Sequence, residues 1–147
     1  MAQNPNPQTP ASYGASINLE TARTVATAAI AEAARNGWTV AVAIVDAGGD
    51  LVYFERLDGT QVASSQISQD KARTAARFKR PSKQFEDALA GGRLAILGLA
   101  GITPLEGGIP LILDGKIVGA VGVSGVTSQQ DGVCAQAGAD ALGKPSE

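Results

Sequence analysis

The sequence EGGIPLILDGKIVGAVGVSG, residues 106–125, decides how this chain folds. It contains two apolar runs, Ile109 to Leu113 and Ile117 to Val123, which are separated by Asp114-Gly115-Lys116. An Asp-Gly pair between apolar runs predicts a β-hairpin, because both central residues of a type I′ turn require a positive φ. Neither run alternates polar with apolar residues, so we expect both faces of these strands to be covered.

The rest of the chain predicts a second hairpin and four helices. Helices are recognised by apolar residues at helical spacing, strands by short apolar runs, and their ends by capping and turn residues. Two hairpins separated by helices favour an α+β architecture in which helices cover an antiparallel sheet. In chain order, the predicted elements are a helix over 19–35, strands over 38–45 and 51–56, helices over 65–78 and 83–89, a short irregular segment over 93–103, the hairpin described above, and a helix ending near Leu142.

Capping residues mark the helix starts. Asn18 is a suitable N-cap for the first helix, and Ser82 for the third. For the last helix, Thr127 or Ser128 is the candidate N-cap, and Asp131 takes the place of the capping-box acid three residues after Ser128.

Composition excludes several functions. The net charge is −2, which argues against a nucleic-acid partner. No run approaches the roughly 18 apolar residues that span a bilayer, so we expect no membrane partner. The chain has no histidine and one cysteine, Cys134, which excludes histidine-based catalysis, an intrachain disulfide and thiolate clusters. We therefore predict no metal site.

The two ends differ from the centre. We expect a disordered leader over 1–16, one domain over 17–143 and a tail over 144–147. The start Met1-Ala2-Gln3 is typical of a secreted protein after removal of its signal peptide, with a Met placed in front as a new start. It favours a periplasmic or secreted protein over a cytoplasmic one. A leader that is merely disordered explains the same residues.

Lys71 lies on the apolar side of its predicted helix. On a helical wheel it shares an arc with Ala72, Ala75 and Phe78, whereas the arginines 73, 77 and 80 lie on the opposite side. A buried lysine needs a partner or a lowered pKa, so Lys71 is a candidate to bind a carboxylate or to act as a base. The alternatives are a side chain that snorkels to the surface or a structural ion pair with an acid such as Asp70 or Glu106. The arginines indicate a solvated face or, alternatively, an anion site.

Glu106 precedes Gly107-Gly108 at the mouth of the hairpin. A carboxylate beside two glycines could face a ligand that approaches the backbone closely, or it could be an exposed loop acid.

Several motifs together resemble the GlcG/HbpS-like family, which includes the C-terminal domain of PduO-type proteins. The match covers nearly everything from Asn18 to Leu142. The motifs together are specific for this family, although each alone is a weak signal. In order, they are Val45-Asp46-Ala47-Gly48-Gly49, Asp70-Lys71-Ala72 with Thr74-Ala75-Ala76, Gly107-Gly108-Ile109-Pro110-Leu111, Val118 to Gly125, and the helix from Gln129 to Leu142.

The resemblance implies a profilin-like arrangement with a five-stranded antiparallel sheet and helices packed on it. It also implies a homo-oligomer, haem or a related tetrapyrrole as the ligand, and export in some members. Many relatives carry a histidine directly after the Ala-Gly-Gly turn, where this chain has Asp50. The usual histidine is therefore absent, and the cofactor stays undetermined. The remaining candidates for an axial ligand are Tyr13, Tyr53, Lys71, Thr103 and Cys134.

Three functions follow from this sequence. The first is a small-molecule-binding protein with haem as the named ligand, and its ligand-binding residues are Asp50, Tyr53, Arg93, Thr103, Gly107 and Gly108. The second is an enzyme for proton transfer on a small carbonyl or carboxylate metabolite, with Lys71 and Glu106 as catalytic residues. The third is a structural or partner-binding oligomer.

Overall fold

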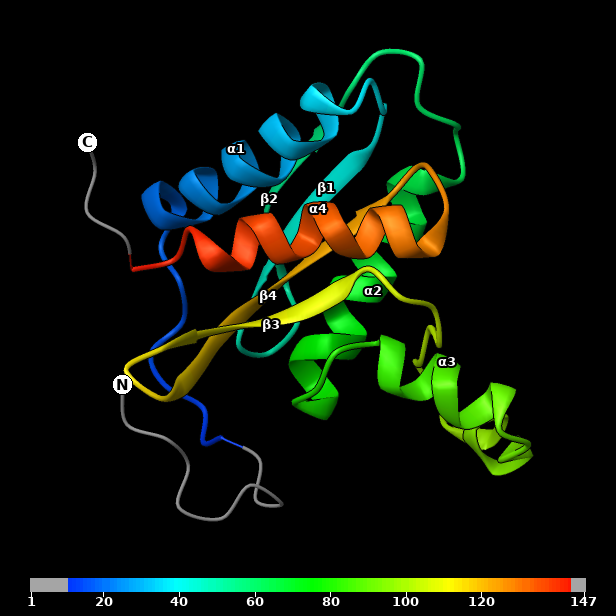
Figure 1. The fold of residues 1–147 in the computed structure, drawn as a ribbon. Coiled ribbons are helices and arrows are strands. Elements are labelled where there is room, and N and C mark those ends of the chain that lie inside the picture. The colour runs from blue at the N-terminus through cyan, green and yellow to red at the C-terminus, as the bar shows by residue number, and fades with distance from the viewer. Residues whose placement is uncertain (1–10, 144–147) are drawn as a thin grey trace.

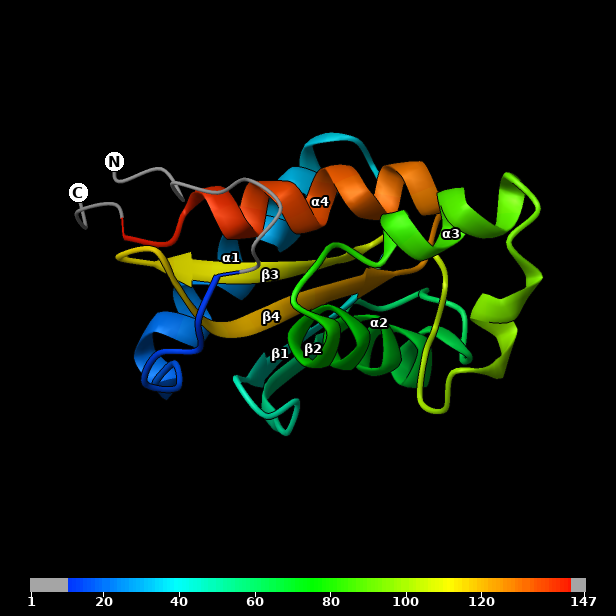
Figure 2. The ribbon, with the colours of Figure 1, turned by 90° about the horizontal axis from the view of Figure 1, so that it is seen from below.

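The sheet of this protein lies between two layers of helices, as Figures 1 and 2 show. The computed structural model describes residues 11–143. Helices α1 and α4 cover one face of the sheet, and α2 covers the other. The elements are α1 (Leu19–Arg35), β1 (Ala41–Asp46), β2 (Leu51–Arg56), α2 (Ser64–Phe78), α3 (Lys83–Ala90), the 3₁₀ helix η1 (Leu94–Gly98), β3 (Gly108–Leu113), β4 (Lys116–Ser124) and α4 (Ser128–Asp140).

The sheet has four antiparallel strands in the order β2-β1-β4-β3, so the prediction of five strands was wrong. The two hairpins supply all four strands of the sheet. The chain before α1 lies beside β4, where the Gly14 N–H donates to the Ile117 carbonyl at 2.9 Å. It contributes only one isolated bridge, between Tyr13 and Ile117, because its contact with β4 is too short to form a ladder.

The hairpin predicted from the sequence is confirmed. Asp114 and Gly115 have φ values of 52° and 76°, as a type I′ turn requires. Leu113 pairs with Lys116 across the turn, and the pairing continues to Gly108 opposite Gly122. The turn therefore sets the register as far as Ile112, and a bulge between Leu111 and Ile112 shifts the pairing by one residue beyond it.

Both faces of the central strands are buried, which explains why their apolar runs do not alternate with polar residues. On β1, Val42 and Ile44 belong to the core beneath α1 and α4, whereas Ala43 and Val45 belong to the core beneath α2. The α2 side is built largely from alanine and glycine. Because these side chains are small, α2 packs close to the sheet.

Several elements differ from the prediction in their bounds or caps. The first strand begins at Ala41 rather than residue 38, because the Trp38 N–H donates to the Ala33 carbonyl and completes the end of α1. Ser82 does not cap α3 through its side chain; its hydroxyl instead donates to the Leu105 carbonyl and accepts the Gly108 N–H. The irregular segment over 93–103 contains the 3₁₀ helix η1.

The N-cap of α4 is Thr127, whose capping box is completed by Gln130 rather than by Asp131. Asp131 is thereby free to point into the protein. At α1, the predicted Asn18 cap is confirmed, since its side chain accepts the Thr21 N–H at 2.8 Å.

No helix within residues 11–143 is long and apolar enough to cross a membrane. The tail over 144–147 and most of the leader lie outside the described residues, as does the Met1-Ala2-Gln3 start on which the predicted localisation rests.

We expect Gly122→Ala to lower the free energy of unfolding by about 3 kcal/mol, because overpacking a dense core is costly. A Cβ on Gly122 would lie 2.6 Å from the backbone nitrogen of Ala72, where α2 meets β4. Gly98→Ala is the matched control, since a Cβ there meets nothing within 4 Å. Urea denaturation of both variants measures the difference, and equal midpoints would contradict the close approach of α2.

Candidate functional site

Helix α2 places Lys71 in the interior, where it is 1% exposed. Its Nζ donates to the Val123 carbonyl at 3.1 Å and to Asp131 Oδ2 at 3.0 Å. The sequence predicted the burial but named Asp70 or Glu106 as the structural partner. Asp70 instead pairs with Arg73 at 3.2 Å. Lys71 is thus enclosed in an ion pair between α2 and α4.

The partner, Asp131, was missed as a site residue because its sequence position suggested a cap. It is 2% exposed, and its Oδ1 accepts the Val126 N–H at 3.1 Å. Burial raises the pKa of the Asp131 carboxyl, while the charge and hydrogen bond of Lys71 oppose that change. The sequence did hold one signal: Asp131 lies at helical spacing from Ala135 and Gly138, which are both buried.

A cavity of about 320 Å³ lies between α4 and the start of β3, and we call it the glycine slot. It contains three of the predicted site residues, Glu106, Gly107 and Gly108, together with Gly132 of α4. Lys71 lies behind its wall, since a Cβ on Gly107 would be 2.9 Å from the Lys71 Nζ. The structure therefore brings Lys71 and Glu106 into one neighbourhood, although only Glu106 faces the cavity.

A second cavity, of about 460 Å³, lies between α2, the turn of the first hairpin and the loop before β3. We call it the arginine pocket, because Arg73 and Arg77 line it beside Asp50, Ile102 and Thr103. It joins two predicted ligand-binding residues, Asp50 and Thr103, that are far apart in the sequence. The sequence left open whether the arginines form a solvated face or an anion site. In the structure, Arg73 and Arg77 form part of the wall of this pocket.

The arginine pocket is held by hydrogen bonds to the backbone. Arg77 Nε donates to the Gly48 carbonyl at 3.0 Å, and Arg73 Nε donates to the Gly49 carbonyl at 3.4 Å. On the other side, the Thr103 N–H donates to Thr74 Oγ1 at 2.9 Å. Both arginines are therefore tied through their Nε atoms to the turn of the first hairpin.

The other predicted ligand-binding residues lie outside both cavities. Tyr53 packs against the core on the α1 side, and its hydroxyl donates to Glu55 Oε1 at 2.7 Å, which raises the pKa of the phenol. Arg93 is exposed just before η1. The Tyr13 hydroxyl donates to the Ala76 carbonyl, and burial raises the pKa of the Cys134 thiol to about 11.

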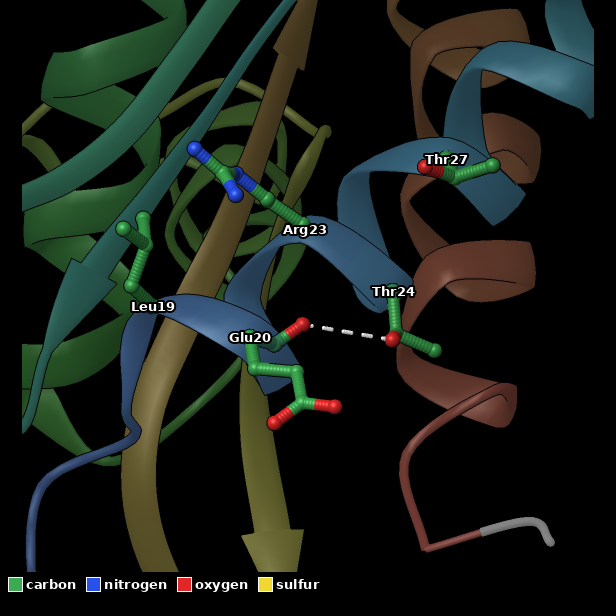
Figure 3. A pocket seen from close by; sticks show the side chains of 5 residues that line it. All are labelled: Leu19, Glu20, Arg23, Thr24 and Thr27. Atoms are coloured by element: carbon green, nitrogen blue, oxygen red, sulfur yellow. Dashed lines mark hydrogen bonds between the residues drawn. The ribbon is translucent and has the colours of Figure 1, made fainter. Parts of the chain in front are cut away.

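A hollow of about 640 Å³ lies on the exposed face of α1 and is not a convincing site. Figure 3 shows that the side chains lining it all come from that one helix. Its Thr24 hydroxyl donates to the Glu20 carbonyl within the helix. A ligand there would be enclosed by a single element, whereas several elements converge on the glycine slot and the arginine pocket.

The fold places this chain among α+β proteins with an antiparallel sheet between helical layers. Residues 17–140 match the model of a family described as haem degrading protein HbpS-like. The chain is 41% identical over 108 residues to Protein GlcG of Escherichia coli (strain K12), which covers 74% of this chain and 81% of GlcG. This chain belongs to the HbpS-like family.

Solved structures agree with the family assignment. A double mutant of HbpS from Streptomyces reticuli superposes with a TM-score of 0.82 at 29% identity, covering 98% of this chain and 97% of that one. The structure of a PduOC:haem complex superposes with a TM-score of 0.78 at 26% identity, covering 87% of this chain and 96% of that one.

We expect Lys71→Met to lower the free energy of unfolding by about 3–5 kcal/mol, because it leaves Asp131 buried without its countercharge. The double variant Lys71→Met/Asp131→Leu removes both charges and should recover much of that loss. Urea denaturation of the wild type, both single variants and the double variant gives the coupling between the two residues. Additive losses would show that the two charges do not depend on each other.

Proposed function

We propose that this protein binds a small molecule that carries carboxylate groups, and that the arginine pocket holds it. The observation that carries the proposal is the pair of anchored guanidinium groups, Arg73 and Arg77, beside Asp50 and Thr103. Guanidinium groups bind carboxylates through two parallel hydrogen bonds. Most small-molecule sites are formed before the ligand binds, as this pocket is.

The arginines keep donors for a ligand. A guanidinium has five N–H groups, and the named contacts of Arg77 use one of them. Arg73 uses two, one to the Gly49 carbonyl and one to Asp70. The remaining donors support carboxylate binding. Asp50 and Asp70, which also line the pocket, carry negative charges that oppose it, and Asp70 is paired with Arg73.

A tetrapyrrole is the ligand that the family suggests, because PduOC, a structural neighbour of this chain, forms a haem complex. The pocket fits the carboxylates of such a molecule through its arginines. It does not fit the iron, because the chain contains no histidine and the pocket offers only Asp50, Asp70 and the neutral hydroxyl of Thr103 instead. We therefore propose binding through the carboxylates alone.

This proposal predicts that iron-free protoporphyrin and hemin bind with similar affinity, since the metal adds no contact. Arg77→Ala should weaken both by about 10-fold or more, which is the loss of one charge-assisted hydrogen bond. Absorbance titrations of the purified protein at fixed pH measure both affinities. Arg80→Ala is the matched control, because it removes an exposed arginine of the same region that does not line the pocket.

Asp50→His tests the role of the iron separately. The variant supplies a histidine that can ligate the iron, so it should strengthen the binding of hemin and shift the Soret band of hemin. The binding of iron-free protoporphyrin should strengthen less. A wild-type protein that binds hemin at least tenfold more tightly than protoporphyrin would contradict binding through carboxylates alone. Equal affinity of wild type and Arg77→Ala would exclude the arginine pocket.

We also propose that the protein forms a homo-oligomer through the segment between α3 and β3. Leu94 and Leu97 of η1 are 70% and 67% exposed, and Leu99 and Leu105 of the same segment are exposed as well. This segment lies at the end of the molecule that carries α3, away from α1 (Figures 1 and 2). Clustered exposed leucines are typical of a protein interface, and the resemblance to an oligomerising family favours a second copy of this chain as the partner.

Leu97→Asp should shift the protein towards the monomer, because a charge in the centre of an apolar interface is costly. Light scattering coupled to size-exclusion chromatography measures the mass. Leu19→Asp, at the exposed start of α1, is the control and should leave the mass unchanged. A monomeric wild type would overturn the proposal.

A further inference from the structure

The glycine slot has no role in the carboxylate binding proposed above. Its volume of about 320 Å³ equals that of about ten water molecules, so it admits a ligand of similar size. Glu106 lies on one side, and the apolar side chains of Ile109 and Val133 form part of its wall. Lys83 and Gln136 also line it, and a mainly apolar cavity with a few polar groups is typical of a site for a small organic molecule.

The Glu106 carboxylate is incompletely satisfied. It is half-buried, yet it makes no hydrogen bond or ion pair with any residue in the described range 11–143, and only its backbone N–H is engaged, by Glu86 at 3.3 Å. Burial raises the pKa of this carboxyl. No side-chain oxygen or nitrogen of the described residues is both buried and unpaired, so the Glu106 carboxylate is reached from the slot and its oxygens can accept hydrogen bonds from a ligand there.

The charges around the glycine slot favour a cation as its ligand. Lys83 also lines the slot, but its Nζ is held by Asp87 at 2.7 Å. Glu86 and Asp87 both raise the pKa of Glu106, and Lys83 and Lys71 lower it. The positive charge of Lys71 is balanced by Asp131 at 3.0 Å. These groups together leave an excess of negative charge at Glu106.

Gly132 makes room for the carboxylate. A Cβ on this residue would lie 2.5 Å from Glu106 Oε2 and 2.9 Å from its Cγ. The Glu106 side chain therefore lies directly on the backbone of α4, and this position depends on the missing side chain. The contact can be removed by adding a single methyl group, because the flexible glutamate can move away.

We propose that the glycine slot binds a small primary amine as its ammonium ion, with Glu106 accepting its N–H groups and Ile109 and Val133 contacting its alkyl chain. This site is separate from the arginine pocket and does not depend on the function proposed for it. The two sites select ligands of opposite charge.

The test uses n-butylammonium, with n-butanol as an uncharged probe of the same shape, and follows the backbone amide signals by NMR. Wild type should bind butylammonium saturably and at least tenfold more tightly than butanol. Glu106→Gln should remove this preference, because it keeps the shape and loses the charge. Asp58→Asn, which removes an exposed loop acid, is the matched control and should bind as the wild type does.

Gly132→Ala provides a second test. Alanine favours the helix, so the variant should fold while Glu106 is displaced, and its affinity for butylammonium should fall at least tenfold. Binding to the wild type should strengthen as the pH rises through the pKa of Glu106, because only the ionised carboxylate attracts the ammonium ion. Equal binding of butanol and butylammonium, or an unchanged affinity of Glu106→Gln, would overturn the proposal whatever the porphyrin titration shows.

Discussion

The buried ion pair between Lys71 and Asp131 is the interaction on which the rest of this structure depends. It joins α2 on one face of the sheet to α4 on the other, and its ammonium also binds the Val123 carbonyl of β4. Two buried charges are tolerated only when each satisfies the other. The pair therefore requires that both helices and the end of β4 take up one definite arrangement.

The cavities follow from this arrangement. The Lys71 ammonium lies against Gly107, so the backbone before β3 passes close to α2. The glycine slot lies on the other side of this backbone segment. The opposite side of α2 carries Arg73 and Arg77, which bind the turn of the first hairpin. Helix α2 thus lines the arginine pocket with Arg73 and Arg77, and its Lys71 lies behind the wall of the glycine slot.

Local interactions explain why much of the fold could be predicted from the sequence. The Asp114-Gly115 turn needs only the backbone freedom of its own residues, and the start of α1 needs only the Asn18 side chain. The inward position of Lys71 follows from helical periodicity. The expectation of five strands came from the resemblance to a family rather than from the residues, whose two hairpins supply four strands.

The sequence by itself determined the order of the elements, both hairpins, the burial of Lys71 and the separate candidates Asp50, Thr103 and Glu106. Only the tertiary structure decided that Asp131 is the partner of Lys71, that Asp50 and Thr103 share a pocket with two arginines, and that Tyr53 and Arg93 lie elsewhere. The physical reason is the range of the forces involved. Turn geometry and helix faces depend on near neighbours, whereas the partner of a buried charge depends on how distant segments pack.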